Sequence, residues 1–159
     1  MLWFLFLAIL LVPSIAHAHC DVPCGVYSPE AALLAAKTVW TLVKKILELK
    51  HPVSNASQPE VDAFENTISR MVAVKEEHAQ ICKKELLILW TDYFKPEHLS
   101  MFPRLHETFW TSAKLCSKNK QNVDLAAAEQ LQTSVGEIAR IFAQAEEVKK
   151  KAAVAAAVK

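Results

Sequence analysis

The chain has 159 residues, a formal net charge of +1 and only two glycines. Low glycine, abundant Ala, Leu, Lys and Glu, and long intervals without proline favour an all-helical protein with one core that needs neither metal nor disulfides to fold. The charges are spread evenly along the sequence, so it lacks the basic patch that a nucleic-acid-binding protein needs. We therefore expect no nucleic-acid partner.

The N-terminal segment, residues 1–18, has the pattern of a cleaved signal peptide. Residues 2–12 form an apolar run too short to span a bilayer comfortably, and the small-residue pattern Ala16-His17-Ala18 follows it. A buried N-terminal helix is the alternative. Cleavage after Ala18 would make His19 the N-terminus of an exported chain that is secreted, periplasmic or lumenal, with plastid targeting as a further option. We expect no membrane association after this cleavage.

The first two predicted helices are marked by their caps. Ser28-Pro29-Glu30 predicts the start of a helix, which His51-Pro52 would end. Ser57-Gln58-Pro59-Glu60 is a capping box, and no further proline follows until Pro96, so the second helix is the longest element. Apolar residues recur at spacings of three and four, interrupted only by Lys75. They are Leu33, Ala36, Trp40, Val43 and Leu47 on the first helix, and Ile68, Val72, Ala79, Cys82, Leu86, Leu89 and Tyr93 on the second.

Two further helices are predicted in the second half of the chain. The third begins at Pro103 and ends near Lys118, and residues 117–121 read as a polar turn. Asn122 is expected to cap the fourth helix, whose tail from Lys149 should fray. The apolar residues available for packing are Phe109, Trp110, Ala113 and Cys116 on the third helix, and Leu131, Val135, Ile138, Phe142 and Ala145 on the fourth. Short connections predict an antiparallel four-helix bundle over residues 28–159.

Residues 19–27, His-Cys-Asp-Val-Pro-Cys-Gly-Val-Tyr, concentrate groups that bind metals. After cleavage, the amine and imidazole of His19, the amide nitrogen of Cys20 and the thiolates of Cys20 and Cys24 could converge in one hook. Two nitrogens and two sulfurs in a plane suit nickel(II), whereas zinc prefers a tetrahedron, and two thiolates tend to reduce copper(II). The alternative is a secreted helical interaction protein with a Cys20–Cys24 disulfide and a second bridge between Cys82 and Cys116.

Two stretches resemble the nickel-dependent superoxide dismutase family. Residues 19–27 resemble its nickel hook, and residues 89–96, Leu-Trp-Thr-Asp-Tyr-Phe-Lys-Pro, resemble its second diagnostic block. The similarity runs from His19 to about Phe142. It implies a four-helix bundle assembled into a homohexamer, one nickel ion per subunit, and disproportionation of superoxide to dioxygen and hydrogen peroxide by a Ni(II)/Ni(III) cycle. It also implies that an N-terminal extension is removed before the nickel site forms, which matches the predicted cut after Ala18.

The resemblance also implies roles for individual residues. His19, Cys20 and Cys24 would bind the metal, with the His19 imidazole as an axial ligand. Tyr27 and Tyr93 would flank the substrate approach and order water that delivers protons. The expected catalytic set is thus Tyr27, Asp21 and Tyr93, and the expected residues around it are Asp92, His78 and Lys95.

Other residues would support the hook, and two further positions depart from the family pattern. Asp21 and Asp92 would hold the hook and its surroundings through hydrogen bonds, and Lys95 would help to attract an anion. Ala35, however, stands where members commonly carry a glutamate that hydrogen-bonds the axial imidazole, and His78 stands where an arginine supports that contact. Such losses can cost a metal site roughly 10- to 100-fold in performance. His78 could supply a substitute hydrogen bond or be a satisfied core histidine, and a non-enzymatic nickel- or copper-binding protein is the second interpretation.

Overall fold

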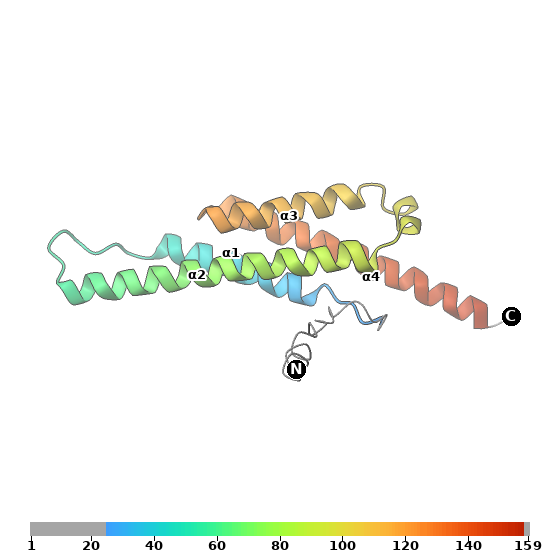
Figure 1. Cartoon of the computed structure of the whole chain (residues 1–159), viewed down its shortest axis with the longest axis horizontal. Coiled ribbons are helices and arrows are strands. Elements are labelled where there is room, and N and C mark those ends of the chain that lie inside the picture. The colour runs from blue at the N-terminus through green and yellow to red at the C-terminus, as the bar shows by residue number, and fades with distance from the viewer. Residues whose placement is uncertain (1–24, 158–159) are drawn as a thin grey trace, which may run out of the picture.

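The structure, a computed structural model, describes residues 25–157, and this part of the chain is almost entirely helical. Four long helices alternate in direction: α1 (Glu30–Glu48), α2 (Gln58–Ile88), α3 (Leu105–Gln121) and α4 (Leu125–Ala157) (Figure 1). Between α2 and α3 lie a π-helical turn, η1 (Leu89–Tyr93), and a 3₁₀ helix, η2 (Pro96–Ser100). Helices α1 and α3 each pack against both α2 and α4. The predicted all-helical four-helix bundle is confirmed.

Helix α1 begins where the sequence predicts, but it buries a different face. The Ser28 hydroxyl accepts a hydrogen bond of 3.2 Å from the Glu30 backbone N–H. Leu33 and Leu47, predicted to face the core, are 37% and 56% exposed. The buried residues of α1 are instead Ala32, Ala35, Ala36, Val39 and Val43. These small side chains leave room for the backbones of the neighbouring helices to approach closely, which the larger leucines would prevent.

Helix α2 begins at its predicted capping box and is tied to α3 by a buried lysine. The backbone N–H and the hydroxyl of Ser57 both donate to Glu60 Oε2 at 2.8 Å. Lys75 interrupts the apolar stripe in the sequence, yet it is only 1% exposed. Its ammonium donates to the backbone carbonyls of residues 119, 120 and 122 at distances of 2.5–3.1 Å. Because these carbonyls lie at the negative end of α3, the position favours a cation.

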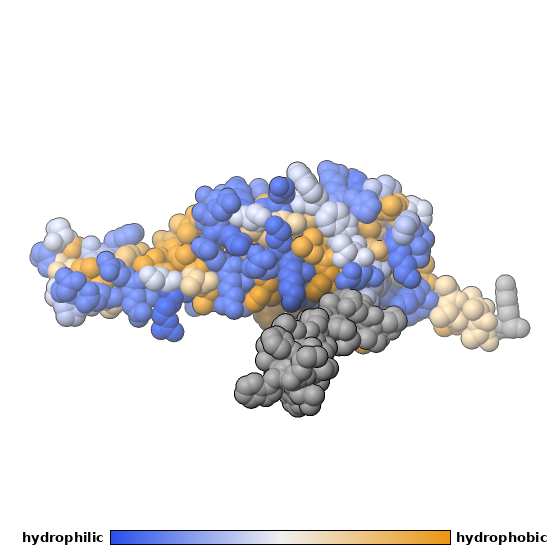
Figure 2. Space-filling model, in the orientation of Figure 1, coloured by the Kyte–Doolittle hydropathy of each residue, from blue (hydrophilic) through white to orange (hydrophobic). Residues whose placement is uncertain are grey.

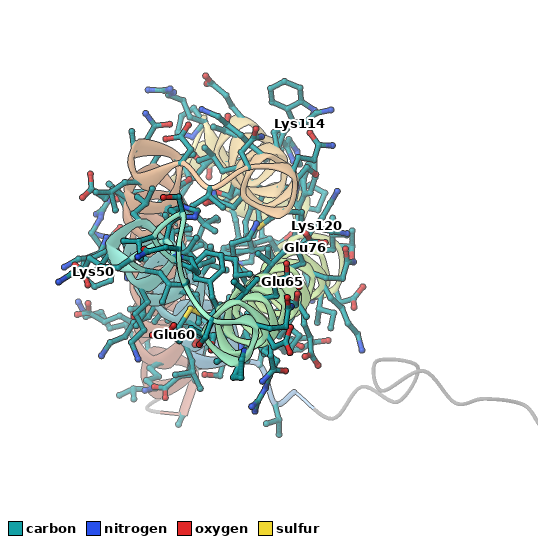
Figure 3. All side chains as sticks on the ribbon, turned by 90° about the vertical axis from the view of Figure 1, so that its left-hand side faces the viewer. Lys50, Glu60, Glu65, Glu76, Lys114 and Lys120 are labelled. Carbon is teal, nitrogen blue, oxygen red and sulfur yellow. The ribbon has the colours of Figure 1, made fainter. Side chains whose placement is uncertain are left out.

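The N-terminal half of α2 extends beyond the other helices, accompanied by the linker of residues 49–57 (Figure 1). Ile68 and Val72, predicted to face the core, are only half-buried there. The ring of His51 packs on Phe64, with their centroids 4.9 Å apart. Apolar residues are interspersed with hydrophilic ones on this arm (Figure 2). In the end-on view the labelled charged side chains, such as Glu65, point away from the bundle axis (Figure 3).

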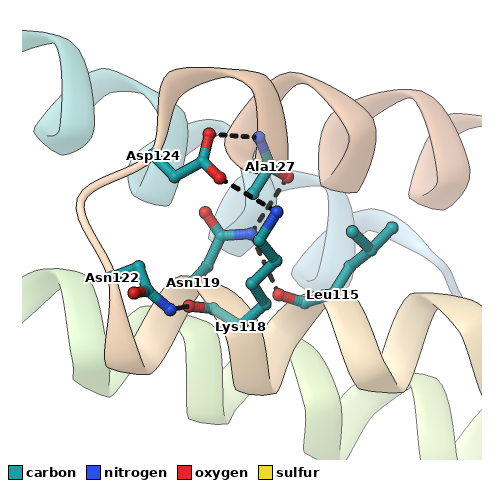
Figure 4. A network of polar contacts seen from close by, with 6 residues as sticks. All are labelled: Leu115, Lys118, Asn119, Asn122, Asp124 and Ala127. Atoms are coloured by element: carbon teal, nitrogen blue, oxygen red, sulfur yellow. Dashed lines mark hydrogen bonds and ion pairs between the residues drawn. The ribbon is translucent and has the colours of Figure 1, made fainter.

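The connection between α3 and α4 is shorter than predicted. Helix α3 continues through residues 117–121, which the sequence predicts as a turn. Asn122 ends α3, because its backbone N–H and its side-chain amide both donate to the Lys118 carbonyl, at 3.1 and 3.0 Å. The cap of α4 is Asp124, which accepts the Ala127 N–H at 3.1 Å and pairs with the Lys118 ammonium at 2.9 Å (Figure 4). The prediction of Asn122 as the α4 cap is therefore wrong by two residues.

The C-terminal end of α4 projects past the bundle (Figure 1). Residues 149–157 are all exposed and helical, where the sequence predicts fraying. With 33 residues, α4 is therefore longer than α2, which has 31 and is predicted from the sequence to be the longest element. This stretch consists of alanine, lysine and valine, and alanine and lysine are strong helix formers, so intrinsic propensity favours the helix without packing. None of the helices within residues 25–157 combines the length and apolarity that crossing a membrane requires.

Trp110 and Cys116 of α3, both predicted to pack in the core, differ in their burial. Trp110 lies on the surface, 58% exposed, with the Lys114 ammonium 5.5 Å from the centre of its ring. Cys116 is fully buried against Cys82 of α2, and both are free thiols. The hydrogen bond with Cys116, together with burial, raises the pKa of the Cys82 thiol. The second disulfide considered from the sequence is therefore absent from the structure.

Candidate metal centre

The predicted hook meets the described structure at Gly25. His19, Cys20, Asp21 and Cys24 lie outside the described residues. Gly25 has a φ of 68°, a left-handed conformation that favours glycine over residues with a side chain. It lines a cavity of about 740 Å³ formed by the segment before α1, the two short elements after α2, and the end of α4. The chain thus leads from the predicted ligands directly to this cavity.

Four predicted site residues line this one cavity, although they are far apart in the sequence. Tyr27 comes from the segment before α1, Asp92 and Tyr93 come from η1, and Lys95 follows η1. The rings of Tyr27 and Tyr93 pack together with their centroids 5.6 Å apart. The structure therefore brings Tyr27, the last residue of the first stretch, to the same cavity as Asp92, Tyr93 and Lys95 of the second.

The π-helical turn η1 sets the direction in which Tyr93 points. The Phe94 N–H donates to the Leu89 carbonyl at 3.1 Å, five residues back, which widens the last turn of the long helix. The sequence predicts an ordinary helix up to Lys95, and its apolar spacing carries no signal of this wider turn. Tyr93 and Phe94, on either side of the end of this turn, are each 8% exposed.

Tyr93 is enclosed by aromatic rings and hydrogen-bonded through its hydroxyl. Its ring centroid lies 4.5 Å from that of Phe142, 4.8 Å from Phe94 and 5.8 Å from His98. Its hydroxyl donates to Glu146 Oε1 of α4 at 2.8 Å. Burial raises the pKa of the Tyr93 phenol, and the hydrogen bond to Glu146 raises it further. The phenol is therefore a neutral group at physiological pH.

Asp92 and Lys95 stand at the exposed side of the cavity. The Asp92 carboxylate lies 2.9 Å from the Thr91 hydroxyl, and both residues are exposed. The Lys95 side chain is also exposed, while its backbone N–H donates to His98 Nδ1 at 2.9 Å. Lys95 and Lys149 contribute positive charge to the cavity lining, and Asp92 and Glu97 contribute negative charge.

The two departures from the family pattern lie elsewhere. Ala35 is buried in the bundle core at 1% exposure and offers no polar group. His78 is half-buried on α2, and its Nδ1 atom is buried without a hydrogen-bond partner in the described part of the chain. Neither residue lines the cavity.

The donor set for a metal is confined to the hook. No group of three or more His, Cys, Asp or Glu side chains within residues 25–157 is arranged to hold a metal ion. Two thiolates with amine, amide and imidazole nitrogens form a soft, electron-rich set that suits nickel in a plane. The residues present in the sequence at positions 19–24 therefore fit the metal that the resemblance implies.

Two cavity neighbours were missed by reasoning from the sequence, Glu146 and His98. Glu146 lies one helical turn after Phe142, so the apolar stripe of α4 places it beside the ring that packs on Tyr93. That spacing is a signal, although nothing in the sequence connects α4 to the end of α2. His98 carries no such signal, because its position depends on the irregular turn before η2.

The comparisons with known proteins agree with this arrangement. The family model for nickel-containing superoxide dismutase matches residues 14–146. The superoxide dismutase [Ni] of Streptomyces coelicolor is 31% identical over 134 residues, which cover 84% of this chain and 92% of that protein. The superoxide dismutase [Ni] of Streptomyces seoulensis matches with the same identity and coverage.

Solved structures give the same result at the level of the fold. A native nickel superoxide dismutase structure superposes with a TM-score of 0.67 and 30% identity over 80% of this chain and 99% of that one. A structure of a nickel-containing superoxide dismutase in the oxidised state gives a TM-score of 0.68 over 81% of this chain and 99% of that one. These matches define the class of protein, a helical superoxide dismutase. The chain belongs to the nickel-containing superoxide dismutase family.

Proposed function

We propose that this chain is a nickel superoxide dismutase whose active site forms where the hook meets the cavity beside Gly25. When bound, one nickel ion per subunit would supply one-electron chemistry between Ni(II) and Ni(III), oxidising one superoxide to dioxygen and reducing another to hydrogen peroxide. The observation that carries the proposal is the meeting of Tyr27 and Tyr93 at one cavity, next to the chain segment that bears the ligands.

The proposed ligands are His19, Cys20 and Cys24. The His19 amine and the Cys20 amide nitrogen belong to consecutive residues and can close a five-membered chelate ring. The thiolates of Cys20 and Cys24 and the His19 imidazole would complete the set of donors that holds the nickel ion. Gly25 supports this assignment, because its left-handed backbone turns the chain beside the cavity immediately after Cys24.

The cavity residues have separate tasks in this proposal. Conversion of two superoxide ions to dioxygen and hydrogen peroxide consumes two protons, so the site must hold ordered water near the reacting oxygen. Tyr27 and Tyr93 would order that water, and Lys95 would draw the anion toward the rim. Asp21 and Asp92 would hold the hook through hydrogen bonds.

The proposal includes processing of the precursor. Before cleavage the His19 nitrogen is a peptide amide, so the amine ligand exists only after residues 1–18 are removed. We propose that a signal peptidase makes this cut during export, and that the mature chains assemble into a homohexamer. His78, considered from the sequence as a substitute support for the His19 ring, does not line the cavity, and we assign it no role in the proposed site. Sedimentation of the mature protein would test the assembly.

Metal analysis and turnover of the mature protein test the function. One nickel per chain with superoxide-dependent turnover is the expected result. Nickel without turnover would instead identify a metal-binding protein that has lost its redox tuning. Absence of metal with an oxidised Cys20–Cys24 pair would indicate a helical interaction protein. The family assignment does not favour either alternative.

A further inference from the structure

The hydrogen bond between Tyr93 and Glu146 joins two elements that are 53 residues apart in the sequence. Tyr93 lines the cavity, and so do Ala145 and Val148 of α4, which lie one residue before and two residues after Glu146. The Glu146 side chain is 28% exposed and also contacts the Lys149 ammonium at 3.4 Å. The Tyr93 hydroxyl is therefore directed at α4 by a carboxylate that is itself held by a neighbouring cation.

A phenol has one proton to donate, and this one is donated to Glu146. The Tyr93 oxygen can then take part in further hydrogen bonds only as an acceptor. Building on the proposed function, we propose that Glu146 is a positioning residue of the metal site that acts through Tyr93. It holds the hydroxyl proton toward α4, so that the oxygen accepts a hydrogen bond from ordered water and does not donate one to the superoxide anion.

The ring of Tyr93 is held by its neighbours, so rotation of its O–H bond is the motion that Glu146 restricts. Phe94, Phe142, His98 and Tyr27 surround the ring, with centroids 4.5–5.8 Å away. Such a ring is held in place by its neighbours, whereas an O–H bond turns freely unless a partner holds it. The carboxylate supplies that partner.

The charges around the pair favour a proton that stays on the phenol. Burial and the contact with Glu146 raise the pKa of Tyr93, and the hydrogen bond from Tyr93 lowers the pKa of Glu146. Lys149 and Lys150 on α4 favour the charged carboxylate as well. His98 of η2 and Tyr27 are the titratable groups that face Tyr93 from the other elements.

Glu146 is the last residue of the family match. Helix α4, however, continues to Ala157. Val148, Lys149 and Ala152 from this continuation form part of the cavity wall. The acceptor for Tyr93 and the wall beside it thus belong to a part of α4 at and beyond the end of the match.

The hydrogen bond can be tested by ultraviolet titration, because Tyr27 and Tyr93 are the only two tyrosines in the chain. In the mature Tyr27→Phe protein, tyrosinate absorbance reports Tyr93 alone. We expect its titration midpoint to lie above the ordinary value of about 10 and to fall when Glu146→Gln is added. Glu147→Gln is the matched control, because Glu147 is the next residue, carries the same charge and pairs with Lys151 instead. An unchanged midpoint with Glu146→Gln would overturn the proposal.

Turnover with nickel bound tests whether Glu146 acts through Tyr93. Glu146→Ala and Tyr93→Phe should each lower kcat/KM by about 10-fold, and the double variant should lose no more than Tyr93→Phe alone. Losses that multiply in the double variant would contradict an action through Tyr93. If the wild-type protein shows no dismutase activity, the proposed function fails, while the ultraviolet titration, which needs no nickel, still decides whether Glu146 holds the Tyr93 proton.

Discussion

Tyr27 and Tyr93 lie with their ring centroids 5.6 Å apart at the cavity where the predicted hook enters the bundle. Tyr27 precedes α1, and Tyr93 is the last residue of η1, which directly follows α2. Their contact therefore lies at the end of the α1–α2 pair. Both line the same cavity as Lys95 and Asp92. This contact joins one residue from each of the two stretches with family resemblance at one cavity.

Tyr27→Phe should reduce dismutation while leaving metal binding intact. Because the proposed task of Tyr27 is to order water beside the hook, loss of its hydroxyl should lower kcat/KM by about 10-fold. Nickel content should not change, because none of the proposed ligands is altered and the ring still packs on Tyr93. Trp110→Phe, at an exposed aromatic outside the cavity, is the control. Full activity of Tyr27→Phe would remove this residue from the catalytic set.

Lys95→Gln should lower the rate in a manner that depends on salt. Lys95 is exposed at the cavity rim, and superoxide is an anion, so the cation should act by attraction over a distance. We expect kcat/KM to fall a few-fold at low ionic strength, and the difference from wild type to shrink as salt screens the charge. Lys84→Gln, an exposed position on α2, provides the control. A deficit that persists unchanged at high salt would indicate a direct contact instead of attraction at a distance.

Stability should decline at alkaline pH because of Tyr93. Its pKa is raised in the folded state, so the folded chain keeps the phenolic proton after the unfolded chain has lost it. The contribution is therefore fully present below about pH 10, the ordinary pKa of tyrosine, and is lost as pH rises above it. Tyr93→Phe should flatten this decline in urea unfolding measured from pH 8 to 11. Equal slopes for the two proteins would show that Tyr93 is not the group responsible.

Lys75→Met should destabilise the bundle. The substitution keeps the apolar stem and removes an ammonium that donates to the carbonyls of residues 119, 120 and 122. Since hydrogen bonds to a charged group are among the stronger ones, we expect the free energy of unfolding to fall by about 2 kcal/mol. The control is Lys84→Met on the exposed face of the same helix. A Lys75→Met protein as stable as wild type would mean that burial of the cation costs as much as its hydrogen bonds contribute.

The helices were predictable because their signals are local. The capping box at Ser57 and the Ser28-Pro29-Glu30 start are read within four residues, and both are confirmed. Lys75 was not predictable as a buried residue, because its partners are carbonyls more than 40 positions away. Asn122 was assigned to the wrong helix for a related reason: its amide can satisfy either the end of α3 or the start of α4, and Asp124 competes for the second role.

The candidate site was predictable in its residues and less so in its surroundings. Tyr27, Asp92, Tyr93 and Lys95 were named from resemblance, and the cavity brings them together. The acceptor for Tyr93 was not named, because Glu146 reaches it only through packing of α4 against the end of α2. The π-helical turn was equally hidden, since one wider turn leaves the apolar spacing almost unchanged.

The most direct test of the central claim is the nickel content and superoxide turnover of two proteins, one beginning at His19 and one carrying a single additional alanine before it. The extra residue converts the His19 amine into a peptide amide and changes nothing else in the ligand set. We predict one nickel per chain and dismutase activity for the protein that begins at His19, and loss of both for the extended protein. Equal nickel content and equal turnover in the two proteins would contradict a site created by cleavage after Ala18.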